Sequence, residues 1–228
     1  MVELDYFYDP ICGWCYAAAP LIRKARELMP VNLRAGGLMI GANRQPVNES
    51  LRRYVMPHDQ RIQALTGQPF GDAYFNGLLR DQDAVFDSEP PIRAVLAAES
   101  LGGDALAMLH RLQQAHYVEG ERIADLATLT RLAQSIGLDG ERFTAQMSVN
   151  ASSAAAHIQA TRREMTRLSL RGYPSLALII DGSVVPVTVG PYLGKPDAFA
   201  AHLEALIGSK TQNDDTDEAP FCTPDGCS

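Results

Sequence analysis

The chain has 228 residues, 46% of them hydrophobic and 21% charged, a composition that supports a real core in one domain or in one domain with a sizeable insertion. The formal net charge is −7, and without a cluster of Lys and Arg this charge argues against a nucleic-acid partner. No run of about 18 apolar residues is present, so we expect no membrane-spanning helix and no membrane partner. The N-terminal residues lack the pattern of a secretory leader, which favours the cytoplasm, although a chain trimmed of its leader would begin in the same way.

The first forty or so residues have the pattern of a β-α-β unit. Residues 2–8 alternate apolar and polar side chains and include aromatic and β-branched types, which predicts a strand. After Cys12-Gly13-Trp14-Cys15, apolar residues recur at helical spacing over residues 16–28, and Pro20 is expected to kink this helix. A second strand is predicted over residues 31–40. The two cysteines therefore lie at a strand-to-helix turn.

A long helical region follows, from about His58 to Leu168, with no convincing strand. Apolar side chains line one face of residues 126–136, at the spacing of core packing. We interpret this region as an all-helical insert whose stripe carries no information on ligand binding. Asp125 is expected to cap the start of one helix and Gly137 to end it. Two further helices are expected to start at Asp139 and at Ser152 or Ser153.

The strand pattern returns over residues 176–180. Asp181-Gly182 predicts a hairpin turn into a further strand over residues 184–189, in which Pro186 indicates an edge position. An amphipathic helix over residues 197–207 then closes the fold.

The Cys-x-x-Cys segment carries the predicted chemistry. A thiolate, and not a thiol, attacks a disulfide. Cys12 falls at the first turn of the helix, where unpaired backbone N–H groups and the helix dipole favour an anion. Cys15, one turn later, can reach Cys12 and resolve a mixed disulfide. We expect Gly13 to leave room for a bulky substrate and Trp14 to offer an apolar contact beside the sulfurs.

A second feature is Gly172-Tyr173-Pro174-Ser175, directly before the strand at residue 176. A cis peptide bond before Pro174 would turn the chain sharply. The backbone of Tyr173 would then be free to pair with an extended substrate lying across the cysteines. The residues alone favour an ordinary loop proline over a cis-proline in this segment.

With both features in place, the chain resembles the DsbA family of thiol–disulfide oxidoreductases, and within it most closely the FrnE branch. The resemblance rests on the segment from Asp9 to Tyr16, on the long helical insert and on the segment from Gly172 to Ser175. It implies that Cys12 is the nucleophile, that Cys15 is the resolving thiol, and that Pro174 is a cis-proline facing them.

The resemblance also implies an α/β, thioredoxin-like fold with a large all-helical insertion. Residues 1–45 and 170–208 would form the thioredoxin-like domain, and residues 46–169 the insertion. Residues 209–228 would form a flexible acidic tail.

This tail contains a second pair, Cys222 and Cys227, on either side of the turn-forming sequence Thr-Pro-Asp-Gly. The FrnE branch includes members with a second cysteine pair near the C-terminus. The resemblance thus predicts a secondary redox pair that exchanges electrons with the first. A flexible linker starting at Gly208 would reach roughly 20 Å, enough for contact with Cys12. A passive disulfide or two idle thiols fits the residues equally well.

The predicted function is thiol–disulfide exchange on protein disulfides. Gly-Trp separates the cysteines, in place of the Pro-His of the strongly oxidising periplasmic members. One cationic stabiliser of the thiolate is therefore missing, which favours a reductase or isomerase over a strong oxidase. The expected partners are protein thiols and disulfides, together with glutathione or another thiol reductant. We expect no cofactor and no metal.

Two other functions fit parts of the pattern. The helical-insert architecture also resembles kappa-class glutathione transferases and 2-hydroxychromene-2-carboxylate isomerases, which usually carry Ser where this chain has Cys12 and leave no task for Cys15. A Cys-x-x-Cys pair is also half of a zinc site. A zinc-binding thioredoxin-like module would combine Cys12 and Cys15 with Cys222 and Cys227.

Other ionisable residues are interpreted first as structural. Asp9, three residues before the predicted nucleophile, could relay a proton, although packing is the simpler role. The same holds for the five scattered histidines, which are His58, His110, His116, His157 and His202.

Overall fold

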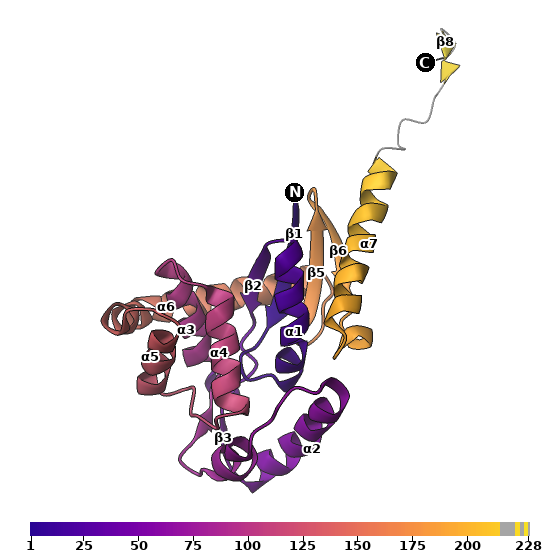
Figure 1. The fold of residues 1–228 in the computed structure, drawn as a ribbon. Helices are drawn as coiled ribbons and strands as arrows, with labels where there is room; N and C mark the ends of the chain where they lie inside the picture. Colours follow the sequence, from indigo (N-terminus) through magenta and orange to yellow (C-terminus); the bar gives the residue numbers. More distant parts are fainter. Residues whose placement is uncertain (215–221, 224–225, 228) are drawn as a thin grey trace.

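A four-stranded mixed sheet lies at the centre of the computed structural model, with helices on both faces (Figure 1). The structure describes the backbone of residues 1–214, 222–223 and 226–227, and the side chains of residues 1–209 except residue 151. The strands follow the order β2-β1-β5-β6 across the sheet. Their bounds are β1 (Val2–Tyr8), β2 (Val31–Ala35), β5 (Ser175–Ile180) and β6 (Ser183–Val187).

Helices cover the sheet and build the insertion between β2 and β5. The Asp139 side chain accepts a hydrogen bond from the backbone N–H of Arg142 at 2.8 Å, and this predicted cap starts the longest helix. Among the helices that the structure describes, none combines the length and the apolar character needed to cross a membrane. The bounds are α1 (Gly13–Leu28), α2 (Glu49–Thr66), α3 (Glu89–Ser100), α4 (Ala105–Tyr117), α5 (Leu126–Ser135), α6 (Gly140–Arg167) and α7 (Pro196–Asp214), with short turns η1 (Gly41–Asn43), η2 (Ala73–Gly77), η3 (Leu78–Arg80) and η4 (Gly190–Tyr192).

Strand β1 is central and is buried on both faces. It pairs in parallel with β2 and antiparallel with β5, and β5 pairs antiparallel with β6. Leu4 and Tyr6 belong to the main core, which includes the buried face of α1. Phe7 points the other way and packs against Met165 of α6. A strand enclosed in this way holds the loop that follows it, which leads to the cysteines, in a fixed place.

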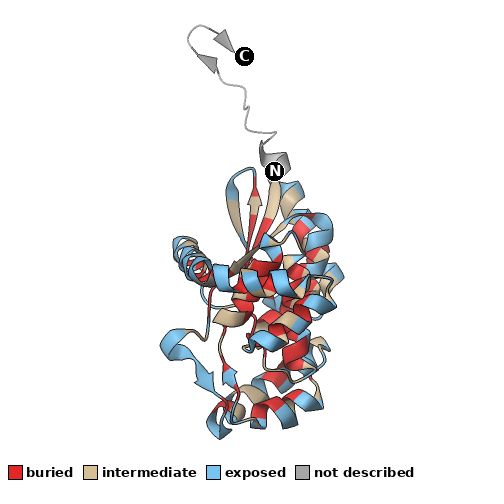
Figure 2. Cartoon of the chain, turned by 90° about the vertical axis from the view of Figure 1, so that its left-hand side faces the viewer, coloured by how far each residue is buried: buried red, intermediate tan, exposed pale blue. Residues whose placement is uncertain are grey.

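The insertion is helical except for one short ladder. The two-residue strands β3 (Gln45–Pro46) and β4 (Val85–Phe86) pair antiparallel. Helices α3 to α6 pack together, while α2 lies beside α1 (Figure 1). Figure 2 shows buried residues on the inward sides of these helices and exposed residues on their outer sides. The architecture confirms the predicted thioredoxin-like α/β fold with a large helical insertion, and corrects "all-helical" by one small ladder.

Two predictions in the first half of the chain need correction. Strand β2 ends at Ala35 and not at Ile40. Gly36 and Gly37 follow it, and Gly37 has a φ of +68°, so the chain turns away from β1 toward the insertion. Strand β4 was not predicted, because two residues show no periodicity. Pro20 lies inside α1, and the helix continues through it.

Two helices in the second half are longer than predicted. Helix α6 runs without a break through residues 152 and 153. The hydroxyl of Ser153 donates to the backbone carbonyl of Asn150 at 3.1 Å, so it is satisfied within the helix and does not cap a new one. Helix α7 continues past Ile207 to Asp214, into the region predicted as a flexible tail. Strand β6 ends two residues early, at Val187, and lies at the sheet edge as its proline predicts.

The second cysteine pair is described in its backbone alone. Strands β7 (Cys222–Thr223) and β8 (Gly226–Cys227) pair antiparallel, with Cys222 opposite Cys227. Their side chains, like residues 215–221, lie outside the described part of the chain. Their redox role therefore stays a prediction.

Candidate active site

Cys12 lies at the N-terminus of α1, where the sequence predicts it. Its backbone is extended (φ −89°, ψ 115°), and its carbonyl oxygen accepts the backbone N–H groups of Cys15 at 3.0 Å and Tyr16 at 3.1 Å. The residue is 8% exposed. The positive end of the α1 dipole and the unpaired N–H groups of the first turn therefore lie at Cys12.

Cys15 is fully buried one turn further along α1. Burial, together with the hydrogen bond and the charge of Cys12, raises the pKa of the Cys15 thiol well above its usual range. The hydroxyl of Tyr6 donates to the Cys15 carbonyl at 3.2 Å, which fastens this turn to β1. Both thiols are free. The more accessible cysteine thus lies at the helix start, and a protonated partner lies behind it.

The loop before β5 faces Cys12. The peptide bond between Tyr173 and Pro174 is cis, as predicted. The Tyr173 carbonyl oxygen lies 3.6 Å from the Cys12 sulfur and accepts its thiol hydrogen bond. Segments about 160 residues apart in sequence therefore meet at one sulfur atom. The backbone before Pro174 is placed beside the position that a disulfide substrate would take.

The ring of Tyr173 is held by a glycine. A Cβ atom on Gly36 would lie 1.7 Å from the Tyr173 hydroxyl oxygen, a distance that no side chain tolerates. The guanidinium of Arg162 on α6 donates to the carbonyl oxygens of Gly36, at 2.8 Å, and of Gly37. Helix α6 thereby positions the loop after β2, and this loop positions Tyr173 next to Cys12.

Asp9 is buried and holds three chain segments together. Its Oδ1 accepts the backbone N–H of Ile11 and the hydroxyl of Ser88, each at 3.0 Å, and its Oδ2 accepts the N–H of Leu38 at 2.5 Å. Burial raises the pKa of Asp9, and these hydrogen bonds oppose the shift. Since both oxygens are engaged, the geometry favours the structural role over proton relay.

A pocket of about 180 Å³ opens beside Cys12, between α1 and the insertion. Its walls are mostly apolar and aromatic, including Met39 and Phe86. Trp14 lines it as well, with the Arg61 guanidinium 5.9 Å from the centre of its ring. The predicted apolar contact at Trp14 is therefore placed in the same pocket as the Cys12 sulfur.

The space beside Gly13 is occupied by the protein itself, which corrects its predicted role. A Cβ atom on Gly13 would lie 2.7 Å from Asp59 Oδ1 and 3.0 Å from Ile62 Cδ1. Both residues belong to α2. The glycine between the cysteines thus lets the insertion approach the motif and does not leave room for a substrate at that point.

Asp59 is the site residue that sequence reasoning missed. It is 4% exposed and lines the pocket that contains Cys12. The Tyr74 hydroxyl donates to its Oδ2 at 2.7 Å. Burial raises the pKa of Asp59 to about 7, although the hydrogen bond from Tyr74 opposes this shift. One acidic residue in a polar stretch of helix gives no local signal of burial.

The two histidines of α4 are packing residues. Burial lowers the pKa of His116 to about 3. The pKa of His110 is lowered to about 4, and burial makes the largest contribution to this shift. Neither ring nitrogen of His116 has a hydrogen-bond partner among the described residues. The ring instead packs edge-on against Phe86 and Tyr117, with centroid distances of 4.9 and 4.7 Å.

The other histidines have separate settings. His157 on α6 accepts the backbone N–H of Ala35 at 3.0 Å and so covers the end of β2. His202 stacks on Tyr192. His58 differs from the rest, because it lines the pocket beside Cys12.

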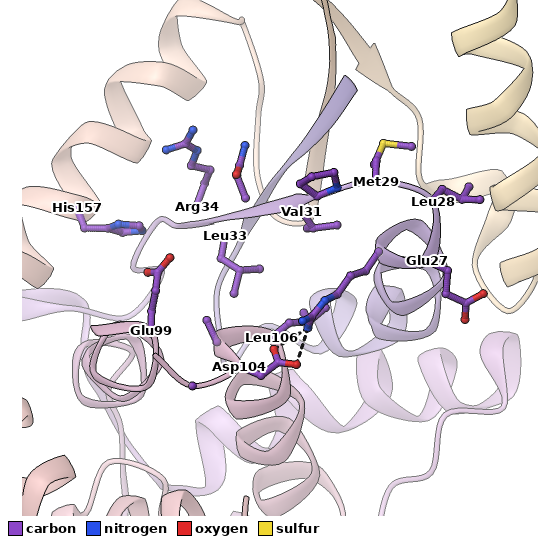
Figure 3. Close-up of a pocket in the computed structure, with 15 residues that line it drawn as sticks. Glu27, Leu28, Met29, Val31, Leu33, Arg34, Glu99, Asp104, Leu106 and His157 are labelled. Atoms are coloured by element: carbon purple, nitrogen blue, oxygen red, sulfur yellow. Dashed lines mark hydrogen bonds and ion pairs between the residues drawn. The ribbon is translucent and has the colours of Figure 1, made fainter. Parts of the chain in front are cut away.

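A larger hollow lies along the free edge of β2 and is separate from the cysteines (Figure 3). Its volume is about 790 Å³. The strand residues Val31 and Leu33 line it together with Leu106, and Arg26 binds Asp104 at 2.6 Å across its wall. Neither Cys12 nor Cys15 lines this hollow, so it has no part in the thiol site.

The side chains that the structure describes form no group of three or more His, Cys, Asp or Glu that could hold a metal ion. The four-cysteine zinc hypothesis also requires Cys222 and Cys227, whose side chains lie outside the described part.

Comparisons with known proteins agree with this geometry. The model of the DSBA-like thioredoxin domain matches residues 3–193. The cytosolic disulfide reductase DsbM from Pseudomonas aeruginosa is 50% identical, with a TM-score of 0.85 over 90% of this chain and 98% of that one. Its structure with GSH gives 48% identity and a TM-score of 0.83 over the same shares.

A candidate protein disulfide isomerase from Nitrosomonas europaea is 25% identical, with a TM-score of 0.75 over 91% of this chain and 98% of that one. No curated protein matches the sequence. The comparisons leave the finer placement in the FrnE branch as a prediction. The family model covers most of the chain and the disulfide reductase covers nine tenths of it, so this chain belongs to the DsbA-like thioredoxin family of protein disulfide oxidoreductases.

Proposed function

We propose that the protein reduces disulfides through Cys12 and Cys15, and that a small thiol of the glutathione type restores its reduced state. The observation that carries this proposal is the arrangement of the two free thiols, one at the helix start and one buried behind it. Cys12 lies at the helix start beside the Tyr173 carbonyl, and Cys15 is fully buried behind it with a raised pKa. This order suits attack by the first sulfur and resolution by the second.

The exchange proceeds in two steps. The Cys12 thiolate attacks one sulfur of a substrate disulfide, and the other substrate sulfur leaves. In this mixed disulfide Cys12 no longer carries a negative charge, so one contribution that raises the pKa of Cys15 is gone. Cys15 then loses its proton, attacks the Cys12 sulfur and releases the second substrate thiol. Two molecules of the small thiol then reduce the resulting Cys12–Cys15 disulfide to two thiols and leave joined as one disulfide.

Substrate orientation is assigned to the backbone around the cis-proline. Tyr173 presents its backbone next to the Cys12 sulfur, and an extended peptide or a glutathione-like tripeptide can pair with such a segment. The apolar pocket lined by Trp14 also borders Cys12, and Tyr173 is not among its lining residues. Trp14, Tyr173 and Pro174 are therefore the proposed substrate-binding residues.

The direction of electron flow is supported by two observations. No histidine lies between the cysteines, so the thiolate of Cys12 lacks that cationic stabiliser and the couple is less oxidising. DsbM, at 50% identity, is a cytosolic disulfide reductase, and it has been solved with GSH. We extend both properties to this chain, namely a cytosolic location and a glutathione-type reductant.

Equilibrium titration against glutathione redox buffers tests the proposal. Trp14 is the single tryptophan and lies between the two cysteines, so its fluorescence reports their oxidation state. A midpoint potential near about −270 mV supports a reductase, whereas a midpoint near about −120 mV would assign an oxidase. Cys12→Ser provides the baseline, because it cannot form the disulfide.

A further inference from the structure

A buried acid shares the active-site pocket with the attacking sulfur. Asp59 and Cys12 both line the cavity of about 180 Å³ beside Trp14. Asp59 comes from the insertion and reaches the motif from α2, where its Oδ1 lies next to Gly13. Tyr117 lines the same pocket as both groups. Burial raises the pKa of its phenol most, and the charges of Tyr74, Asp59 and Cys12 raise it further.

One oxygen of Asp59 has no hydrogen-bond partner within the described part of the chain. Oδ2 accepts the Tyr74 hydroxyl, but the described residues give no hydrogen bond to Oδ1. This atom lies next to Gly13, the residue directly after Cys12. A Cβ atom added to Gly13 would lie 2.7 Å from it. Oδ1 is not among the fully buried unpaired atoms of the described residues, so on a side chain that is only 4% exposed it keeps access to the pocket that Asp59 lines.

We infer that Asp59 takes up the proton of the thiol that enters at Cys12 and returns it to the thiol that leaves. The inference rests on the proposed exchange at Cys12 and names the group that handles its proton. Asp9 is not suited to this task, because Ile11, Leu38 and Ser88 engage both of its oxygens.

The step balances as follows for a small thiol and the Cys12–Cys15 disulfide. The S–H proton passes to the Asp59 carboxylate, and the resulting thiolate attacks the Cys12 sulfur. A bond forms between these two sulfurs, the Cys12–Cys15 bond breaks, and its electron pair stays on Cys15. In the opposite direction, the thiolate released from Cys12 takes the proton back from the Asp59 carboxylic acid.

The ionisation of Asp59 suits this exchange. Burial places its pKa at about 7, so both protonation states are populated near neutral pH, where a proton acceptor and donor works best. The other ionisable groups around it are Cys12 from α1, His58, Tyr54 and Arg61 from α2, Tyr74 from η2 and His116 and Tyr117 from α4.

The test is single-turnover reduction of the oxidised full-length protein by glutathione, followed by Trp14 fluorescence from pH 5.5 to 9. Asp59→Asn keeps the size and can keep the Tyr74 hydrogen bond, but it cannot accept the proton. We expect the rate at pH 7.5 to fall by at least about tenfold. In the parent the Asp59 carboxylate acts on neutral glutathione, whereas the Asp59→Asn variant can use only glutathione thiolate that has already formed. The ratio of the parent rate to the variant rate should therefore be level below pH 7 and step down above it.

Two neighbouring variants sharpen the test. Tyr74→Phe removes the hydrogen bond that favours the ionised carboxylate, so the step in the ratio should move to higher pH. His58→Asn should leave the step in place, because it changes the neighbouring titratable residue of α2 and leaves the Asp59 carboxylate unchanged. Together these outcomes assign the step to Asp59.

A purely structural role predicts a different result. If Asp59→Asn lowers the rate by the same factor at every pH, or does not lower it, the inference is wrong. Unfolding curves show whether the fold survives. Asp59→Asn should unfold at a higher temperature than the parent above pH 7, because it removes a carboxylate that burial makes costly to ionise. A parent protein that glutathione does not reduce at all would instead overturn the proposed function.

Discussion

The Oδ1 atom of Asp59 lies 2.7 Å from the place that a Cβ atom on Gly13 would occupy. The insertion therefore contacts the Cys-Gly-Trp-Cys segment itself through α2. This contact explains why glycine stands between the two cysteines. It also places a carboxylate in the pocket that Cys12 lines, without any local sequence signal.

Gly13→Ala should destabilise the protein because of this contact. Alanine favours a helix over glycine by about 1 kcal/mol, so a gain in stability would follow if the space were open. We expect instead a loss of roughly 1–3 kcal/mol from overpacking against Asp59 and Ile62. Urea unfolding measures this change.

A double-mutant cycle with Asp59→Ala checks the cause. If the contact with Asp59 produces the loss, Gly13→Ala should cost less in the Asp59→Ala background than in the parent. Equal losses in both backgrounds would assign the strain to another neighbour.

The two cysteines should respond differently to substitution and to alkylation. Cys12→Ser removes the nucleophile and should abolish disulfide reduction. Cys15→Ser should accumulate mixed disulfides on Cys12, because the resolving thiol is missing. In the reduced parent, iodoacetamide should label Cys12 faster than Cys15, since Cys15 is fully buried and its pKa is raised.

Mass spectrometry of the labelled peptides measures both rates. Faster labelling of Cys15 would reverse the assigned roles. Glutathione-dependent isomerase turnover that survives Cys15→Ser would point instead to the chemistry of kappa-class transferases.

Local patterns predicted the parts of the site that are built from neighbouring residues. The strand over residues 2–8, the position of Cys12 at a helix start and the cap at Asp139 each depend on a few adjacent side chains. The cis bond before Pro174 was predicted through the family resemblance, because the residues alone favoured an ordinary loop proline. Asp59 could not be found in this way, because its burial depends on how α2 packs against Gly13.

Long-range packing also explains the misplaced boundaries. Ser153 carries a stop-and-start signal in isolation, yet its hydroxyl is satisfied by Asn150 inside the continuous helix α6. Gly37 ends β2 because its positive φ turns the chain toward the insertion. At both places the tertiary structure, and not the local conformational preference of the residues, determines where the element ends.

Gly36→Ala should impair exchange by displacing Tyr173. An added Cβ would meet the ring at 1.7 to 2.5 Å, so the ring must swing away, and the backbone beside the Cys12 sulfur moves with it. We expect a loss of about tenfold or more in kcat/KM for a disulfide substrate. Gly190→Ala is the matched control, because no atom lies within 4 Å of a Cβ there.

Removing the ring should cancel the effect of Gly36→Ala. In a Tyr173→Ala background the added methyl group meets no ring, so the double variant should equal Tyr173→Ala alone. A further loss in the double variant would show that Gly36 acts through another contact.

Stability in acid should depend on the buried histidines. In the unfolded chain His116 takes up a proton near pH 6.5, but in the folded protein burial lowers its pKa to about 3. The unfolded state therefore binds more protons between these values, and the free energy of unfolding falls as the pH drops below 6.5. One such group removes about 2 kcal/mol between pH 7 and pH 5.

His116→Leu should remove this contribution. Neither ring nitrogen of His116 has a described partner, so an apolar side chain of similar size should cost little at pH 7. Urea unfolding at pH 7, 6 and 5 should show a smaller acid loss in His116→Leu than in the parent. His110, with a folded pKa of about 4, acts in the same direction, and a double variant with His110→Leu should flatten the dependence further. Parallel curves for parent and His116→Leu would mean that His116 is protonated in the folded protein, which its apolar and aromatic surroundings do not allow.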